Sequence, residues 1–78
     1  MSTFERLVKV FRVVFEEEQD LSTVTPETAL REDMGISSIG LLYMAMAVEE
    51  EFGIKFKNDD FAAIQTVGDV ITCIEGKL

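Results

Sequence analysis

The longest apolar run of the chain, residues 39–48, constrains the possible folds more than any other feature. Its ten residues are about half of the roughly 20 that a membrane-spanning helix needs, so we expect no membrane insertion. Gly53, a residue suited to ending a helix, follows shortly after it. The pattern predicts a helix over about residues 38–52, and helical spacing gives it one continuous core-facing stripe made of Leu41, Met44, Ala45, Val48 and Phe52.

A second apolar set lies on the other side of this predicted helix and leads into two carboxylates. Carboxylates are almost never fully buried unless they are paired, so this side must reach solvent. The loop before the helix could fold over the apolar part and hide it, but an exposed apolar patch with a charged rim more often marks an interaction surface. We therefore predict a partner-binding outer face that consists of Ile39, Leu42, Tyr43, Met46, Glu49 and Glu50.

Three further helices are predicted from spacing and capping residues. The first begins at a capping box of Ser2 and Glu5 and ends near residues 19–20, with an apolar face of Phe4, Leu7, Val8, Phe11, Val14 and Phe15. A short one covers residues 58–63, capped by Asn58 or Asp59, and a last one follows the capping pair Thr66 and Asp69.

Residues 21–36 show no period and contain Thr25-Pro26 and Gly35, which predicts a long ordered connection with a short helical turn after Pro26. Its expected anchors in the core are Val24, Ala29, Leu30 and Met34. The predicted fold class is all-α, a small four-helix bundle with three main helices, one short helix and a long loop between the first two. We expect it to be a single domain over residues 1–78, because a chain of this length is too short for two.

Composition excludes several classes of function. Fifteen acidic and seven basic residues give a net charge of −8, which argues against nucleic acid and anionic membranes as partners. The absence of histidine excludes Ser-His-Asp and Cys-His catalysis within this chain. The single cysteine, Cys73, cannot form an internal disulfide and fits a reducing compartment, so we expect a cytoplasmic protein. We also expect it to be a monomer.

Residues 33–40, Asp-Met-Gly-Ile-Ser-Ser-Ile-Gly, resemble the acyl carrier protein signature Asp-x-Gly-x-Asp-Ser-Leu. Residues 49–54 are similar to the acidic end of that family's second helix, and residues 66–70 to the start of its last helix. Together with the amphipathic first helix and the long loop, the resemblance covers nearly the whole chain in the right order.

The resemblance implies a non-catalytic carrier whose Ser38 receives a 4'-phosphopantetheine arm from coenzyme A through a separate phosphopantetheinyl transferase. The arm's thiol would hold an acyl or aminoacyl group as a thioester and present it to acyl-loading and acyl-processing enzymes of a fatty acid, polyketide or related dedicated pathway. Asp33, Gly35, Ser37 and Ile39 would surround the attachment point. The alternative, from a different class, is an unmodified carrier-like helical subunit that acts only through its outer face.

Elementary physics supports the location of this site independently. The unpaired amides and the dipole at a helix N-terminus favour a phosphate group on Ser38. A serine at such a position more often only caps the helix, and both roles are compatible if Ser37 caps and Ser38 is modified. Gly35 gives the backbone freedom for the turn into the helix.

The sequence also departs from the family pattern. The position before the modified serine is usually Asp and here is Ser37, and two positions that are commonly acidic are Gly40 and Tyr43. These differences predict docking through apolar contacts more than through charge. The family can hold its acyl chain in a cleft, and the residues expected to line it here are Leu30, Val48, Phe56, Phe61 and Ile64.

Overall fold

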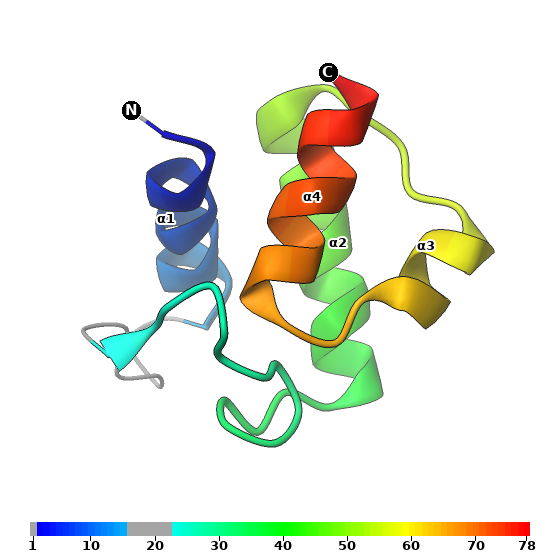
Figure 1. Cartoon of the computed structure of the whole chain (residues 1–78). Helices are drawn as coiled ribbons and strands as arrows, with labels where there is room; N and C mark the ends of the chain where they lie inside the picture. Colours follow the sequence, from blue (N-terminus) through cyan, green and yellow to red (C-terminus); the bar gives the residue numbers. More distant parts are fainter. Residues whose placement is uncertain (1, 16–22) are drawn as a thin grey trace.

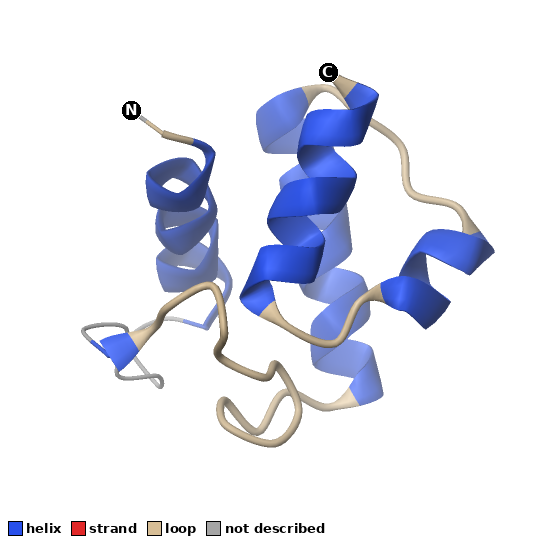
Figure 2. Cartoon of the chain, viewed as in Figure 1, coloured by secondary structure: helices blue, strands red, loops and turns tan. Residues whose placement is uncertain are grey.

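The computed structural model describes residues 2–15 and 23–78 and contains four helices, in agreement with the predicted all-α class (Figure 1). They are α1 (Thr3–Phe15), α2 (Ser38–Phe52), α3 (Asn58–Ala63) and α4 (Val67–Lys77). Outside these four helices, the described residues form loops and turns, apart from a 3-10 position at Thr23 and an isolated antiparallel bridge between Ala29 and Thr66 (Figure 2). None of the described helices is long and apolar enough to cross a membrane.

Helix α1 begins at the predicted capping box. The Ser2 hydroxyl accepts the Glu5 amide at 3.1 Å, and the Glu5 carboxylate accepts the Ser2 amide at 3.0 Å. The apolar face differs slightly from the prediction, because Val10 is buried beside Leu7 and Phe11 while Val8 is only half-buried. The described helix ends at Phe15, and the predicted end near residues 19–20 lies outside the described residues.

The core lies between α1, α2 and α4, with the loop before α2 closing it. The predicted stripe on α2 points inward: Met44, Ala45, Val48 and Phe52 are buried and Leu41 is partly buried. The side chains that are fully or almost fully buried come from all three long helices and from the loop, and they include Leu7, Phe11, Leu30, Met44, Val48, Val67, Val70 and Ile74. Burial of apolar side chains of this size contributes about 1.5–3 kcal/mol each, so this shared core determines how the helices are arranged.

Arg6 joins the N-terminal part of α1 to the C-terminal end of α2. Its guanidinium donates to the Glu51 carboxylate at 3.1 Å and to the Glu51 carbonyl at 2.9 Å. It also lies 4.2 Å from the centre of the Phe52 ring. The two helices are therefore held together at the end of α2 that is remote from Ser38.

Backbone hydrogen bonds fix the long loop to the start of α4. The Leu30 amide donates to the Gln65 carbonyl at 2.9 Å, and the Gly68 amide donates to the Pro26 carbonyl at 2.7 Å. The predicted anchors Leu30 and Met34 are buried and Val24 and Ala29 are half-buried, but Ile36, which was not predicted, is also buried. A turn is present at the predicted place but is not helical: it covers residues 26–27 and is closed by a hydrogen bond of 3.0 Å from the Thr28 amide to the Thr25 carbonyl. The loop that leads into α2 is therefore held by backbone hydrogen bonds to the start of α4 and by side chains buried in the core.

The predicted caps of α3 are wrong, because the residue at the N-cap position is Lys57 and not Asn58 or Asp59. The Asp60 carboxylate reaches back and accepts the Lys57 amide at 2.7 Å. The same carboxylate pairs with Lys77 of α4 at 3.0 Å, which ties the short helix to the last one. An acidic residue in the first turn thus performs the role that sequence analysis gave to a capping residue.

The capping pair predicted for α4 is confirmed. The Thr66 hydroxyl accepts the Asp69 amide, while the Asp69 carboxylate accepts the amides of Gln65 and Thr66, each at 3.0 Å. These backbone hydrogen bonds favour the charged carboxylate and hold the pKa of Asp69 below its usual value of 3.8.

We expect Asp69→Asn to lower the free energy of unfolding at pH 7 by roughly 0.5–1 kcal/mol, as for other helix caps. Since the folded-state pKa is the depressed one, this contribution is present above pH ~4 and is lost as the pH falls through the folded pKa. Denaturant unfolding from pH 7 to pH 2 measures the difference between wild type and variant. Asp59→Asn, at an exposed position of α3, is the control. If the difference in free energy of unfolding between wild type and Asp69→Asn stayed the same from pH 7 to pH 2, the capping role of the Asp69 carboxylate would be wrong.

Candidate functional site

The two adjacent serines at the N-terminus of α2 have different roles. Ser37 is the N-cap, with extended backbone, and its hydroxyl accepts the Gly40 amide at 3.1 Å. Ser38 is the first residue of the helix and its side chain is exposed. The expected capping role of Ser37 is confirmed, and the Ser38 hydroxyl is left accessible from solvent.

The loop residues predicted to shape the site do so at a distance from Ser38. Gly35 has a φ of 68°, in the left-handed region that favours glycine, and lets the chain turn before the buried Ile36. The Asp33 carboxylate accepts the Ala29 amide at 2.8 Å, while the Asp33 amide donates to the Ala29 carbonyl at 3.0 Å. Asp33 thereby closes the turn of residues 29–33 on itself.

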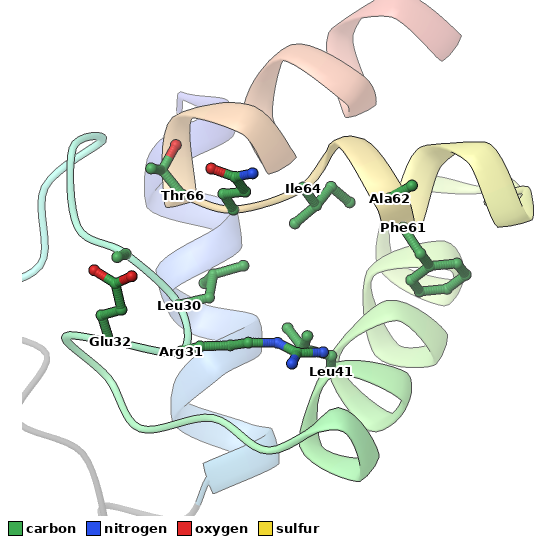
Figure 3. A pocket seen from close by; sticks show the side chains of 10 residues that line it. Leu30, Arg31, Glu32, Leu41, Phe61, Ala62, Ile64 and Thr66 are labelled. Atoms are coloured by element: carbon green, nitrogen blue, oxygen red, sulfur yellow. The ribbon is translucent and has the colours of Figure 1, made fainter.

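That turn carries Arg31, a residue that sequence analysis missed. Its guanidinium Nη2 donates to the Ser38 Oγ at 3.1 Å. Figure 3 shows the Arg31 side chain extending from the loop to Leu41 of α2, while the neighbouring Glu32 points to the other side. An arginine seven residues away in an aperiodic loop gives no sequence signal for this contact, because the contact depends on how the loop folds back.

Two hollows with shared lining residues lie near the start of α2, and only the smaller one is lined by Ser38. The smaller, of about 250 Å³, is lined by Ser38, Leu42 and Met44. The larger, of about 630 Å³, lies under the loop and is lined by Leu30, Gln65 and Thr66, among others. Four residues line both hollows and lie where the two meet: Arg31, Leu41, Phe61 and Ile64.

The predicted cleft is thus only partly the one observed. Leu30, Phe61 and Ile64 line the larger hollow as expected. Val48, however, is fully buried in the core, and neither hollow is lined by Phe56. Phe56 instead packs on Phe61, with ring centres 5.8 Å apart. Phe56 therefore supports a residue that lines the hollow and does not line the hollow itself.

The outer face of α2 is uncovered in the structure. The exposed fractions of Ile39, Leu42, Tyr43 and Met46 are 64%, 55%, 61% and 64%. The alternative in which the loop hides these side chains is therefore wrong for the part of the loop that the structure describes, residues 23–36.

The two carboxylates at the end of the outer face differ in their surroundings. Glu50 is exposed and lines a shallow hollow with Lys9 and Val13 of α1. Glu49 is half-buried, and its carboxylate accepts the Phe56 amide at 2.6 Å. Glu49 therefore also organises the connection between α2 and α3, a role that a surface position on a helix does not indicate.

Comparisons with known proteins agree with these features. Residues 5–74 match the family model described as the phosphopantetheine attachment site. The chain is similar to an acyl carrier protein of Thermotoga maritima, with 44% identity over 59 residues that cover 76% of this chain and 73% of the relative. It is 37% identical over 60 residues to an acyl carrier protein of an Exiguobacterium species, covering 77% of this chain and 76% of the relative. It is also 32% identical over 76 residues to a meromycolate extension acyl carrier protein of Mycolicibacterium smegmatis, covering 95% and 77% respectively.

Proposed function

This chain belongs to the acyl carrier protein family, and on that premise we propose that residues 1–78 form one carrier domain with its arm on Ser38. Acyl carrier function and the 4'-phosphopantetheine cofactor are properties of the family. The attachment residue is our assignment. The observation that carries it is that Ser38 is exposed at the first position of α2, while the hydroxyl of its neighbour Ser37 is engaged in capping.

The residues around Ser38 suit a phosphodiester. The Arg31 guanidinium is already within hydrogen-bond distance of Ser38 Oγ. The first turn of a helix leaves backbone amides without intrahelical acceptors, and these amides and the helix dipole favour negative charge. Ser38 and the first turn of α2 would together hold the phosphate end of the arm.

The arm supplies a thiol that holds the acyl or aminoacyl group as a thioester. The rest of the site belongs to the chain and provides position: Ser37 fixes the start of α2, and Gly35 and Asp33 shape the approach to it. The chain has no histidine to act as a general base toward Ser38. We therefore propose a carrier without catalytic activity. The separate transferase removes the Ser38 proton as Ser38 Oγ bonds to the phosphorus next to the pantetheine of coenzyme A, and the pyrophosphate bond breaks so that adenosine 3',5'-bisphosphate leaves.

We assign the outer face of α2 to partner enzymes, namely the transferase and the acyl-loading and acyl-processing enzymes. Four of its members are more than half exposed, and Ile39 leads directly from the attachment point into this face. Three positions that are usually or commonly acidic in acyl carrier proteins are occupied here by Ser37, Gly40 and Tyr43. Apolar contact should consequently contribute more to docking than charge does.

This assignment predicts a shallow salt dependence for binding of a cognate transferase to the unmodified protein. Between about 50 and 500 mM salt we expect Kd to change by no more than about threefold. Tyr43→Glu, which adds a carboxylate to the outer face, should make the dependence steeper. Isothermal titration at several salt concentrations measures both, and a steep loss of wild-type affinity with salt would contradict the assignment.

The pathway is proposed only by class. The reduced acidic surface favours a dedicated fatty acid, polyketide or related pathway with its own partner enzymes. One relative is named as a meromycolate extension acyl carrier protein, which supports a place for specialised carriers within this family. We further propose a cytoplasmic monomer, because the single cysteine forms no internal disulfide and the net charge of −8 opposes self-association.

Reconstitution tests the proposed function. The unmodified protein is incubated with coenzyme A and a broad-specificity phosphopantetheinyl transferase, and its intact mass is measured. We expect a gain of one phosphopantetheinyl group. If neither this reaction nor a transferase from the native host adds the group, the carrier assignment fails and the unmodified interaction subunit becomes the better account.

A further inference from the structure

We propose that Arg31 binds the phosphodiester on Ser38 and so ties the loop before α2 to the start of that helix in the modified protein. The inference rests on the proposed attachment at Ser38. It begins from the hydrogen bond of 3.1 Å between Arg31 Nη2 and Ser38 Oγ. A phosphate attached to that oxygen would place further acceptor oxygens next to the same guanidinium.

The backbone that carries Arg31 is anchored on both sides. Leu30 is buried, and its amide donates to the Gln65 carbonyl at 2.9 Å while its carbonyl accepts the Ile36 amide at 3.0 Å. On the other side, the Asp33 carboxylate and amide close the turn onto Ala29. The direction of Arg31 is therefore set by the fold of the loop, so the guanidinium meets the start of α2 without large rearrangement.

The charge of Arg31 is available for an anion. Within residues 2–15 and 23–78 the ion pairs are Arg6–Glu51 and Lys77–Asp60, and neither involves Arg31. The adjacent carboxylate, Glu32, points away from the guanidinium (Figure 3). An arginine with free donors recognises phosphate through two parallel hydrogen bonds, which a single serine hydroxyl cannot use.

Arg31 also contributes to the two hollows near the start of α2. Arg31 lines both of them and lies on their shared boundary with Leu41 and Phe61. A guanidinium bound to phosphate would be held at this boundary. In the unmodified protein the same side chain has only the neutral Ser38 hydroxyl as its described hydrogen-bond partner.

The test compares thermal unfolding of unmodified and fully modified protein, with complete modification confirmed by intact mass for every variant. In the wild type we expect modification to raise Tm by about 4 °C in roughly 20 mM salt and by less in roughly 500 mM salt. Arg31→Gln should lose this gain, and Arg31→Lys should keep only part of it, because lysine retains the charge without the planar fork. The matched control is Lys55→Gln, which removes one exposed positive charge beyond the other end of α2 and should keep the full gain.

A second measurement separates contact from general stability. The phosphorus-31 resonance of the arm should shift between wild type and Arg31→Gln and stay unchanged in Lys55→Gln. An equal Tm gain in wild type and Arg31→Gln, together with an unchanged resonance, would overturn the role of Arg31 while leaving Ser38 as the attachment site. Failure of the wild type to gain the arm's mass would instead overturn the proposed function, and this inference with it.

Discussion

Ser38→Ala is expected to abolish attachment of the phosphopantetheine arm completely. The transfer needs a hydroxyl oxygen to bond to phosphorus, and Ser38 presents its hydroxyl to solvent at the first position of α2. Alanine removes that oxygen at an exposed site and favours helix formation, so the fold should persist. Intact mass after incubation with coenzyme A and transferase should show no gain, while circular dichroism should match the wild type.

Ser37→Ala is the matched control for this loss. It removes the hydroxyl that caps α2 through the Gly40 amide, but it leaves the Ser38 hydroxyl in place. We expect it to accept the arm and to lose about 1 kcal/mol of stability, the usual effect of deleting an N-cap side chain. If Ser38→Ala still gained the arm, or if Ser37→Ala alone lost it, the assignment of the two serines would be wrong.

Gly68→Ala should destabilise the protein more than the loss of a helix cap at Ser37 or Asp69 does. A Cβ at this position would lie 2.9 Å from the Pro26 carbonyl oxygen, a backbone atom that also accepts the Gly68 amide. Either the loop or the first turn of α4 would have to move, and overpacking of this kind costs about 1–3 kcal/mol. That is a substantial part of the roughly 4–12 kcal/mol expected for a chain of this length.

Gly76→Ala provides the control within the same helix. Among the described residues, and apart from its chain neighbours and the nearby backbone of α4, no heavy atom lies within 4 Å of the place that a Cβ would take at Gly76, so alanine fits there. Because alanine is the better helix former, this variant should gain up to about 1 kcal/mol. Denaturant unfolding of the pair measures both effects, and a Gly68→Ala protein as stable as the wild type would show that the close approach to Pro26 is not required.

The helices could be predicted from the sequence because their signals are local. The bounds 38–52 and 58–63 agree with α2 and α3, and the spacing of apolar residues on α2 separated a buried stripe from an exposed face. The capping pairs at Ser2 and Thr66 were also predictable, since each partner lies three residues away. Such interactions depend on neighbouring residues and little on the rest of the fold.

The parts that could not be predicted depend on contacts between distant segments. Arg31 reaches Ser38 only because the loop is fixed to residues 65–68, and Gly68 is constrained only because Pro26 approaches it. From the sequence, Glu49 is expected to be a surface carboxylate on a helix. In the structure its carboxylate accepts the amide of Phe56, which lies beyond the turn that ends α2. An aperiodic loop carries no pattern from which these pairings can be read.

Fragmentation mass spectrometry on protein purified from its native host tests directly whether Ser38 carries the arm. We expect a phosphopantetheinyl group in the peptide that contains residues 33–40, with the added mass on Ser38 and none on Ser37. A native protein without this group would show that the chain is not a modified carrier, and a group on another residue would show that Ser38 is not the attachment site.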